Sequence, residues 1–592
     1  MDIVKKYSNI FFGALTSLRN LLSSAWTGLK LTPKVSYRHI PLIIESFSVR
    51  DFIKLSATSL IFIIAGGFLI SGIAGNKNGT LPKEGGEHIE GLVGQPRFIN
   101  PVLAASSSID TDISKVVYAQ LLKFDKDLNL VPDLAESLPT VSEDQKTYTL
   151  KLKPGLLWQD GKPLRSDDVL FTIQTIQNGE FESPLSANWN RVEVKKIDDL
   201  TLSFNLREIS ASFILNFTLG ILPQHVWGEL EPNNFRLSDL HLKPVGSGPF
   251  VVKEIRKTSD GTIKSISLEA NENYHAGRPF LDSLVFKFLK DSAALIAAYQ
   301  AREIDSLGYL PFDRKTFVEA TEKFNQYEIN LPQYQAVFFN LQKTNVLRDK
   351  AVRQALWLVT DREEIIDQVY LGFGEPAYGP ILIGNLGYDP EIKTRTHLNL
   401  AEATDILDRG KWVLDEATGV RVKNETPLEF NLTTNNFVLN VKTAQIIKKQ
   451  WEQVGAKINL IVVSPAELQQ QHIRLRDFDA LLFAQNTGAD PDPFSFWHST
   501  QVKSPGLNIS GFRNNTADQL LTSSRQTNDV NVRAANYQKF QEIIIDEIPA
   551  VFLDSAVYVY NVPKKIQGIN LSTIIHPSER FLDINKWYIK TR

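Results

Sequence analysis

The chain has 592 residues, of which 43% are hydrophobic and 22% are charged, and its formal net charge is -3. This length exceeds what one hydrophobic core usually serves, so two or three domains are expected. The small net charge gives no support for a nucleic-acid-binding protein. Cys is absent and the nine His residues are scattered, which excludes disulfides, thiolate sites and a lipidated cysteine anchor and predicts no metal site and no cofactor.

The first 54 residues carry eight Lys or Arg against three Asp or Glu. Apolar residues recur at spacings of three and four from Phe11 to Leu29, with basic residues nearby. This pattern predicts an amphipathic helix that lies on the inner membrane surface. A segment that packs on a partner protein, or that forms no stable helix, is the open alternative.

Residues 55–75 form an uncharged apolar stretch. As a helix it spans about 31 Å, enough to cross the hydrocarbon core of a bilayer. A cleaved signal peptide is disfavoured because 54 residues precede the stretch. The basic flank places the N-terminus in the cytoplasm, and a polar linker, 76–87, leads to an extracytoplasmic body.

Strands and helices alternate along the body, which predicts α/β layers. The apolar patterning and turn residues predict the following main elements. The expected strands are 88–100, 336–341, 457–463, 478–485 and 550–560. The expected helices are 111–122, a helix capped by Ser166, 291–301, 348–359, 361–370, 400–409, 441–454 and 531–547.

One of these strands, 478–485, ends in a loop rich in Pro and Gly. The loop carries two carboxylates, Asp490 and Asp492, and three aromatic residues follow, the last of which is Trp497. Loops on a rigid scaffold often carry function, and carboxylates beside aromatic walls suit a ligand with a cationic end. The alternative is a surface turn in which Asp caps the next helix.

With these segments in order, the body resembles the solute-binding proteins of family 5, the peptide- and nickel-type receptors of ABC importers. The resemblance covers about residues 89–584. It is carried by the motifs VPDLAESL, YTLKLKPGLLWQDGKPLRSDDVLFT, VGSGPF, NENYHAGRPFLDSLVF, RDKAVRQALWLVTDREEIIDQVYLGFGEPAYGPI and ADPDPFSFW.

The resemblance implies a two-lobe periplasmic-binding-protein-like fold (type II, cluster C), here preceded by one transmembrane helix. The lobes would close on a ligand by hinge motion near 331–332 and 547–548. The implied parts are lobe I at 88–108, 241–332 and 548–592, an inserted subdomain at 109–240, and lobe II at 333–547.

In oligopeptide-binding members of the family, strand backbones pair with the peptide and an Asp receives its α-amino group. The resemblance therefore implies β-augmentation with an ionic clamp at one end. Depending on the alignment, the amine-binding position falls on Asp490 or on Ala489, and the Trp of the family pattern is absent here. The candidate ligand-binding residues are Gln485, Asn486, Asp490, Asp492, Trp497, Asn340 and Tyr118. Structural roles are the alternatives for the last two and for Asp492.

The leading hypothesis is a bacterial membrane-anchored receptor on the periplasmic or extracellular face. It would bind peptides as a monomer, deliver them to an ABC permease and ATPase, and not act as an enzyme. Three alternatives stay open. The solute is another oligomer such as an oligosaccharide; the chain is a sensor that signals through residues 1–54; or it is an anchored hydrolase that uses Asp490 and Asp492 as an acid/base pair.

Overall fold

The computed structural model describes residues 81–308, 324–395 and 397–591. The predicted cytoplasmic segment, the predicted membrane span and the start of the linker lie outside them. Within the described ranges, no helix has both the length and the apolarity needed to cross a bilayer. Residues Pro82–Thr591 group into one unit.

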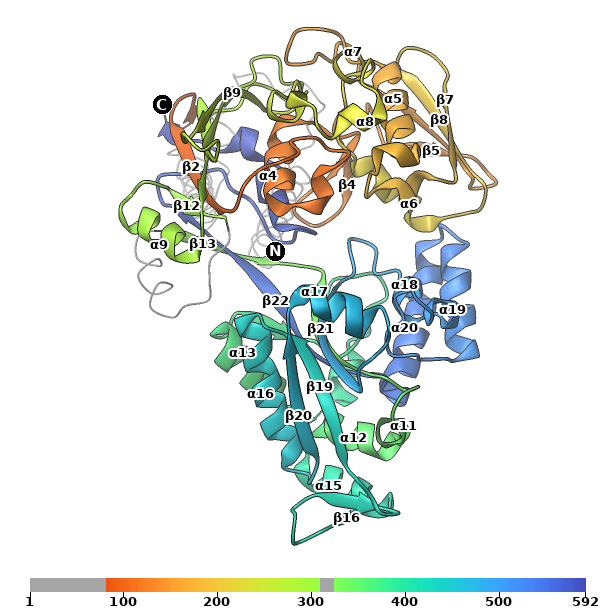
Figure 1. Ribbon diagram of the computed structural model, residues 1–592. Helices are drawn as coiled ribbons and strands as arrows, with labels where there is room; N and C mark the ends of the chain where they lie inside the picture. Colours follow the sequence, from red (N-terminus) through yellow and green to blue (C-terminus); the bar gives the residue numbers. More distant parts are fainter. Residues whose placement is uncertain (1–80, 309–323, 396, 592) are drawn as a thin grey trace, which may run out of the picture. The chain divides into compact units, whose positions relative to one another are not determined.

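The first large sheet of the described residues has five strands in the order β12-β2-β11-β10-β9. Figure 1 labels β2, β9 and β12 of this sheet. Strand β2 pairs in parallel with β11 and β12, whereas β10 is antiparallel to both of its neighbours. β2 ends at Val93, at the Gly94-Gln95-Pro96 turn that the sequence predicts within 88–100, where Gly94 adopts a φ of +115° and turns the chain. The strands are β2 (Glu87–Val93), β9 (Phe250–Lys257), β10 (Ile263–Ala270), β11 (Ser283–Leu289) and β12 (Ser306–Leu307).

One continuous core joins this sheet to the segment that was expected as an inserted subdomain. That segment holds a smaller antiparallel sheet in the order β5-β6-β8-β7 and the helices α4 to α8. We call the part built on this core lobe I. The strands are β5 (Thr140–Val141), β6 (Thr147–Lys151), β7 (Val192–Lys196) and β8 (Thr201–Leu206), and the helices are α4 (Ser108–Val117), α5 (Ser166–Gln177), α6 (Ser186–Trp189), α7 (Gln224–Trp227) and α8 (Pro232–Phe235).

The largest sheet of the described residues has seven strands, of which β14, β21, β19 and β20 lie side by side in that order. β21 is antiparallel to β14 and parallel to β19. The C-terminal ends of β21 and β19 therefore lie at the same end of the sheet. The strands are β13 (Phe324–Asn330), β14 (Gln333–Phe339), β15 (Gly374–Pro376), β19 (Glu429–Asn435), β20 (Lys457–Val463), β21 (Ala480–Asn486) and β22 (Ala550–Pro563).

Helices cover both faces of this sheet, so two cores flank it. One core contains residues of α12, α13, α15 and α16, and the other contains residues of α19 and α20. We call this part lobe II. The helices are α12 (Lys350–Leu358), α13 (Arg362–Tyr370), α15 (Leu400–Arg409), α16 (Val438–Glu452), α19 (Asn515–Arg525) and α20 (Val530–Glu547).

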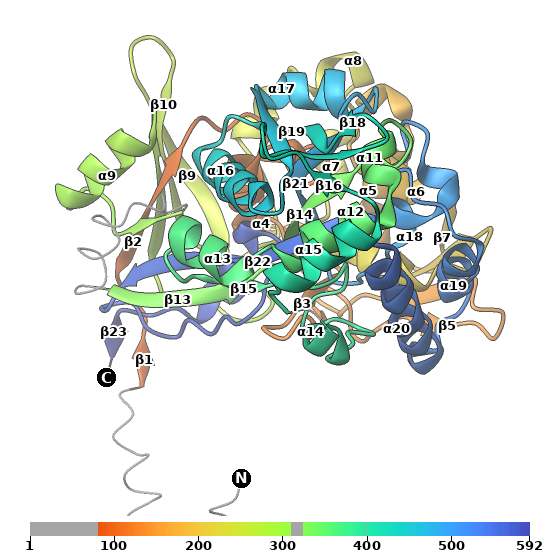
Figure 2. The ribbon, with the colours of Figure 1, turned by 90° about the horizontal axis from the view of Figure 1, so that it is seen from below.

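Strand β22 is shared by the two lobes. Its first residues pair with β14, with Val551 in one core of lobe II and Phe552 in the other. Its last residues pair with β13, which runs alongside it in Figure 2, and Tyr560 lies in the core of lobe I. The chain thus crosses between lobes within β22, later than the 547–548 position expected from the sequence. The first crossing lies between β13 and β14, and the remaining boundaries stay predictions.

Two helix starts differ from the sequence expectation. Ser166 is the first residue of α5 rather than its cap, since Asp168 turns back and accepts the N–H of Arg165 at 2.9 Å. Helix α4 begins at Ser108, three residues early, because Ser107 accepts the N–H of Asp110. In both cases the short polar side chain that satisfies the free N–H groups sets the start.

The other described elements are short. The strands are β1 (Pro82–Lys83), which pairs with β23 (Lys590–Thr591), the hairpin β3 (Leu122–Phe124) and β4 (Leu130–Pro132), and β16 (Val413–Leu414), β17 (Arg421–Lys423) and β18 (Thr426–Pro427). The helices are α9 (Ser292–Gln300), α11 (Asn345–Arg348), α14 (Glu391–Arg395), α17 (Pro465–Glu467) and α18 (Phe494–Trp497). Short 3₁₀ segments include η2 (Ala104–Ser106), η4 (Ala211–Thr218) and η8 (Pro577–Phe581), and η6 (Leu468–Ile473) is a short π-helix.

Candidate functional site

The loop after β21 is fixed by backbone contacts on both sides. The main-chain N–H and the hydroxyl of Thr487 donate to the carbonyl oxygen of Pro332 at 2.7 and 3.0 Å. Gly488 follows with a φ of +72°, which glycine adopts without steric cost. Its N–H donates to Oδ1 of Asn486 at 2.8 Å. The turn therefore has a defined path before the two carboxylates are reached.

Asp490 is paired with a cation of the same chain. Its Oδ2 contacts Nη2 of Arg533 on α20, and the two side chains are only 11% and 9% exposed. The same guanidinium donates to the hydroxyl of Tyr537 at 3.1 Å. Burial lowers the pKa of Arg533, but the charge and hydrogen bond of Asp490, together with Tyr537, outweigh burial and raise the pKa. The predicted amine-binding carboxylate is thus occupied by an arginine.

Asp492 has an arginine of its own. Its Oδ2 accepts from Nε of Arg525 at 2.8 Å, and its Oδ1 accepts the N–H of Phe494 at 3.3 Å. The Arg525 guanidinium lies 3.9 Å from the centre of the Phe494 ring. These contacts order the loop. Since each carboxylate has a separate arginine, Asp490 and Asp492 do not face one substrate together, as an acid/base pair must.

Trp497 and Gln485 lie beneath the loop in the core. Trp497 is 1% exposed, and its ring lies 6.0 Å from the rings of Phe338 and Phe552. Gln485 is also buried, and its side-chain oxygen accepts from the hydroxyl of Tyr334. Neither side chain lines a cavity described below, so both support the loop from underneath.

Asn486 points out of β21 toward the other lobe. It is exposed, and its Nδ2 donates to the carbonyl oxygen of Ile575 in lobe I at 3.1 Å. Among the predicted residues, Asn486 thus makes a direct contact between the lobes.

The remaining two predicted residues, Tyr118 and Asn340, lie in different places. Tyr118 lines a cavity described below, and burial raises the pKa of its hydroxyl. Asn340 lies at the other end of β14 from the loop, where its Nδ2 donates to the carbonyls of Arg476 and Phe478 at 2.9 and 3.0 Å. It lines a small pocket of about 210 Å³ at that end of the sheet. Asn340 is therefore not brought together with Asp490.

One cavity of about 300 Å³, the hinge cavity, lies where the chain first crosses between the lobes. Asp127 and Glu375 are its ionisable lining residues at neutral pH. Lys126 pairs with Asp127 at 2.5 Å, which leaves Glu375 as the acidic lining group without an ion pair among the described residues. The main lining segments are 127–129, 330–332, 375–378 and 381–386, with Tyr388, Ala489, Ser555 and Thr573.

A second cavity of about 490 Å³, the side cavity, shares Ala489 with the hinge cavity. Its walls come from lobe I, and Gly488 and Ala489 reach it from the loop after β21. Apolar side chains form much of the wall: Tyr118, Phe124, Leu185, Trp189, Leu215 and Leu219. Ala489, the alternative amine-binding position, lines both cavities, so the predicted loop borders each of them.

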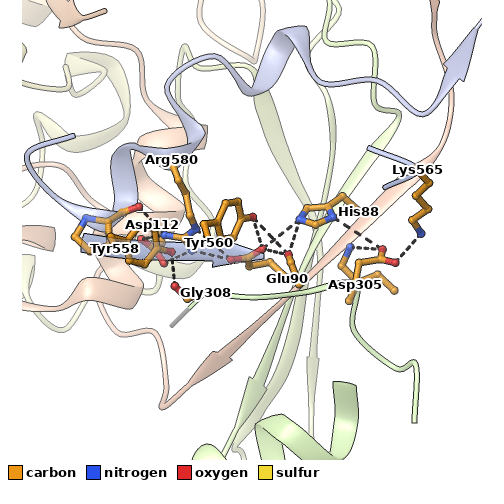
Figure 3. Close-up of polar contacts among 12 residues, drawn as sticks. His88, Glu90, Asp112, Asp305, Gly308, Tyr558, Tyr560, Lys565 and Arg580 are labelled. Atoms are coloured by element: carbon orange, nitrogen blue, oxygen red, sulfur yellow. Dashed lines mark hydrogen bonds and ion pairs between the residues drawn. The ribbon is translucent and has the colours of Figure 1, made fainter. Parts of the chain in front are cut away.

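A buried charged cluster lies elsewhere in lobe I (Figure 3). Arg580 donates to both oxygens of Asp112, at 3.1 and 2.7 Å, and to Oε1 of Glu90 at 3.1 Å. Glu90 also accepts from the hydroxyl of Tyr560 on β22 at 2.8 Å. All three charged side chains are completely buried. The cluster ties the end of β22 to β2 and α4.

His88 in this cluster lies between a serine and a carboxylate. Its Nε2 lies 3.0 Å from the hydroxyl of Ser306, and its Nδ1 lies 4.0 Å from Oδ2 of Asp305. The residue types match a nucleophilic triad. However, the Ser306 hydroxyl is fully buried and donates to Glu90, and none of the cavities described above reaches it. The arrangement is a packed hydrogen-bond network and not a nucleophilic site.

Sequence reasoning missed the arginines that neutralise the loop and, apart from Tyr118, the apolar wall residues of the side cavity. Arg533 lies 43 positions from Asp490 in the chain, so no local pattern links them. The spacing of four between Arg533 and Tyr537 places both on one helix face, which is the signal that was available. In the described ranges, no group of His, Asp or Glu is arranged to hold a metal ion.

A family model for bacterial extracellular solute-binding proteins, family 5, matches residues 129–508. The chain is 30% identical over 533 residues to the oligopeptide-binding protein AppA of Bacillus subtilis, covering 88% of this chain and 94% of AppA. The structure of AppA in complex with a nonapeptide matches 86% of this chain and 100% of that chain, at 28% identity and a TM-score of 0.67. The substrate-binding protein CtaP of Listeria monocytogenes matches with the same coverage and identity and a TM-score of 0.73.

These similarities confirm the two-lobe α/β fold that the sequence resemblance implied. They extend over nearly the whole length of the relatives, so both lobes and the region between them are included.

Proposed function

The chain belongs to the bacterial extracellular solute-binding proteins of family 5, and we propose that it is the peptide receptor of an ABC importer. It binds an extended peptide between its two lobes and passes it to a permease and ATPase without altering it. The proposal is supported by relatives whose names describe oligopeptide and dipeptide binding.

The observation that carries the proposal is the pair of cavities that meet at Ala489. The loop after β21 has a fixed backbone path and borders both cavities, and its main-chain groups can pair with the main chain of an extended ligand. Main-chain pairing is indifferent to side chains, whereas cavities on either side accept alternate side chains. A peptide main chain fits this arrangement.

The hinge cavity can receive the ammonium end of such a peptide at Glu375, since its other acidic lining residue, Asp127, already pairs with Lys126. In this proposal Asp490 does not receive the ammonium group directly, since Arg533 already occupies it. Asp490 and Asp492 hold the loop in place through their arginines, and Gln485 and Trp497 support it from the core.

Of the other predicted residues, Asn486 and Tyr118 contribute most directly to the binding region, and Asn340 stabilises a turn far from it. Closure would occur about the two chain crossings, between β13 and β14 and within β22. The contact between Asn486 and Ile575 would then form part of the closed interface.

Isothermal titration of the purified full-length chain with a mixture of short peptides tests the proposal. Heat of binding is expected, and ligand that co-purifies with the protein should be peptide by mass spectrometry. Binding of a cello-oligosaccharide without any peptide response would instead assign an oligosaccharide receptor, and no retained solute of either class would refute the receptor function.

We further propose that residues 55–75 anchor the receptor in the membrane, with residues 1–54 in the cytoplasm. The support is the uncharged 55–75 stretch and its basic flank. Fractionation of cells should place the full-length chain in the membrane. A protease added outside intact cells should remove the body and spare residues 1–54, and release of the intact chain by alkaline carbonate would contradict the anchor.

A further inference from the structure

The side cavity has a rigid apolar wall. Trp189 at the end of α6 is buried, and its ring lies edge-on to Phe213 at 5.6 Å and to Phe217 at 6.3 Å. Phe217 packs in turn on Phe204 at 4.8 Å. A ring held by other rings keeps its position before a ligand arrives, which lowers the entropic cost of binding.

The rest of this wall combines apolar residues with uncharged polar ones, among them Asn188, Asn216 and Thr218. Leu215 lies on η4, Leu219 directly follows η4, and Leu185 directly precedes α6. Leu185 and Leu215 are half-buried, so they retain surface that a ligand can cover. Covering such surface is favourable in proportion to its apolar area.

The charges that line the cavity are gathered on other elements and are neutralised there. Nζ of Lys115 on α4 lies 3.5 Å from Oε1 of Glu579 on η8. The second oxygen of Glu579 accepts the N–H of Ile575 at 2.8 Å. No ionisable residue lines the cavity from α6 or η4. A charged side chain placed against Trp189 would therefore lose its hydration without gaining a partner.

The cavity is continuous with the proposed path of the peptide. Ala489 lines both the hinge cavity and the side cavity. A ligand whose main chain passes this residue can direct one side chain into the side cavity while the next points the opposite way. The volume of about 490 Å³ lies within the usual range of small-molecule pockets.

We propose that the side cavity is a selectivity pocket for one large uncharged apolar or aromatic side chain of the peptide, with Trp189, Leu215 and Leu219 as its walls. This inference rests on the proposed peptide-binding function. The pocket makes the receptor selective for the side chain at one position of the peptide. Pairing along the main chain alone would not discriminate between side chains at any position.

The test is calorimetric titration of the full-length chain with penta-alanine and with pentapeptides that carry a single Phe, Leu, Asp or Lys at each position in turn. At one position, Phe or Leu should tighten binding on the order of ten-fold to a hundred-fold over Ala. Asp or Lys at that position should weaken it.

The matched variants are Ala105→Trp and Ala417→Trp. Ala105 lines the side cavity and is exposed, so a bulky residue there fills the cavity without disturbing the core; Ala417 is exposed and lines none of the cavities described above. Ala105→Trp should bring the ratio of Phe-peptide to Ala-peptide affinity close to one, and Ala417→Trp should leave it unchanged. Leu215→Asn should reduce the same ratio.

Two outcomes overturn the inference and leave the proposed function standing: peptides bind with equal affinity whatever the side chain, or Ala105→Trp keeps the full preference for Phe. If no peptide of the series binds to the wild-type chain, both the inference and the proposed function fail.

Discussion

The two ends of β22 bury a carboxyl group in opposite ways. At the lobe I end, Tyr560 donates to Glu90, which Arg580 also contacts (Figure 3). At the lobe II end, Asp554 lies on the strand itself and is 1% exposed. Neither oxygen of Asp554 accepts a hydrogen bond of normal geometry from the described residues.

The pKa values of the two carboxyl groups diverge accordingly. Burial raises the pKa of Glu90, but Arg580 and the hydrogen bonds from His88 and Ser306 outweigh it and lower the pKa to about 2. Burial raises the pKa of Asp554 to about 7, and the Tyr370 hydroxyl offsets only part of that. The same loss of hydration thus leaves one group charged and favours the neutral acid at the other.

The surroundings of Asp554 explain this difference. Its cross-strand neighbours are Gln335 on β14 and Pro376 on β15, and Tyr370 reaches it from α13. The side-chain oxygen of Gln335 also lacks a donor. A neutral Asp554 can supply the missing proton to that oxygen, whereas an ionised one cannot. Whether a buried carboxyl group stabilises or destabilises its end of β22 therefore depends on whether a cation is buried beside it.

Replacing the buried cation should have the largest effect. Arg580→Met leaves Glu90 and Asp112 buried without the guanidinium that neutralises them and should lower the free energy of unfolding by roughly 3–5 kcal/mol. Urea denaturation measures it, with Arg409→Met as control, because Arg409 is 79% exposed in its ion pair. Equal midpoints for the two variants would contradict the role given to Arg580. Adding Glu90→Gln and Asp112→Asn to Arg580→Met should recover much of the loss.

Asp554→Asn should stabilise the protein, with a marked pH dependence. Because the pKa of Asp554 is raised in the folded state, its contribution is most favourable below the unfolded pKa of about 3.9 and is lost as the pH rises to about 7. The free energy of unfolding of Asp554→Asn should therefore exceed that of the wild type by a difference that grows over this pH range. The difference should reach about 3–4 kcal/mol and stay constant at higher pH.

Thermal denaturation from pH 4 to pH 9 measures this effect. Asp367→Asn is the matched control, since Asp367 lies on the same helix as Tyr370 and is exposed. A pH-independent difference between wild type and Asp554→Asn would show that the Asp554 carboxyl does not titrate in this range.

Tyr560→Phe should have a smaller effect, because Glu90 keeps its other donors. Removing one hydrogen bond to a buried charged group should cost about 1–2 kcal/mol. The change is measured by denaturation at pH 7. The pKa of Glu90 should also rise, so acid unfolding should begin at a higher pH. An unchanged acid transition would argue that Tyr560 does not hold the Glu90 charge.

Lys565→Met should have the smallest effect. Nζ of Lys565 lies 2.6 Å from Oδ1 of Asp305, but the lysine side chain is 48% exposed. Solvent and salt screen such a pair, so the loss should stay below about 1 kcal/mol. Denaturation at low and high salt measures it. A loss as large as that of Arg580→Met would remove the distinction between buried and exposed pairs.

Sequence patterns predicted the regular elements of lobe II well. Helix 400–409 and strand 457–463 have the observed limits, because local caps and turns define them. The start of α5 was missed because Asp168, not Ser166, satisfies the free N–H group. The crossing within β22 was placed too early, since a strand that changes partners shows no break in its own pattern.

The ligand-binding roles of the candidate site residues stay predictions, and the structure shows which residues they contact. The loop at Asp490 was located, but its carboxylates were assigned to a ligand, and the structure pairs them with Arg533 and Arg525. Trp497 was expected as a wall and lies in the core. These contacts depend on residues far away in the chain. The hydrophobic or charged character of a side chain does not by itself say whether it packs in the core or lines a cavity.

The amino-acid sequence by itself determined the alternation of helices and strands, the position of the loop after β21 and the family resemblance, because these depend on neighbouring residues and their order. Tertiary structure alone decided which charges are neutralised, where the cavities open and which carboxyl on or beside β22 stays ionised. The physical reason is that hydration, ion pairing and cavity walls depend on distances through space, and residues as far apart in the chain as Glu90 and Arg580 share one buried cluster.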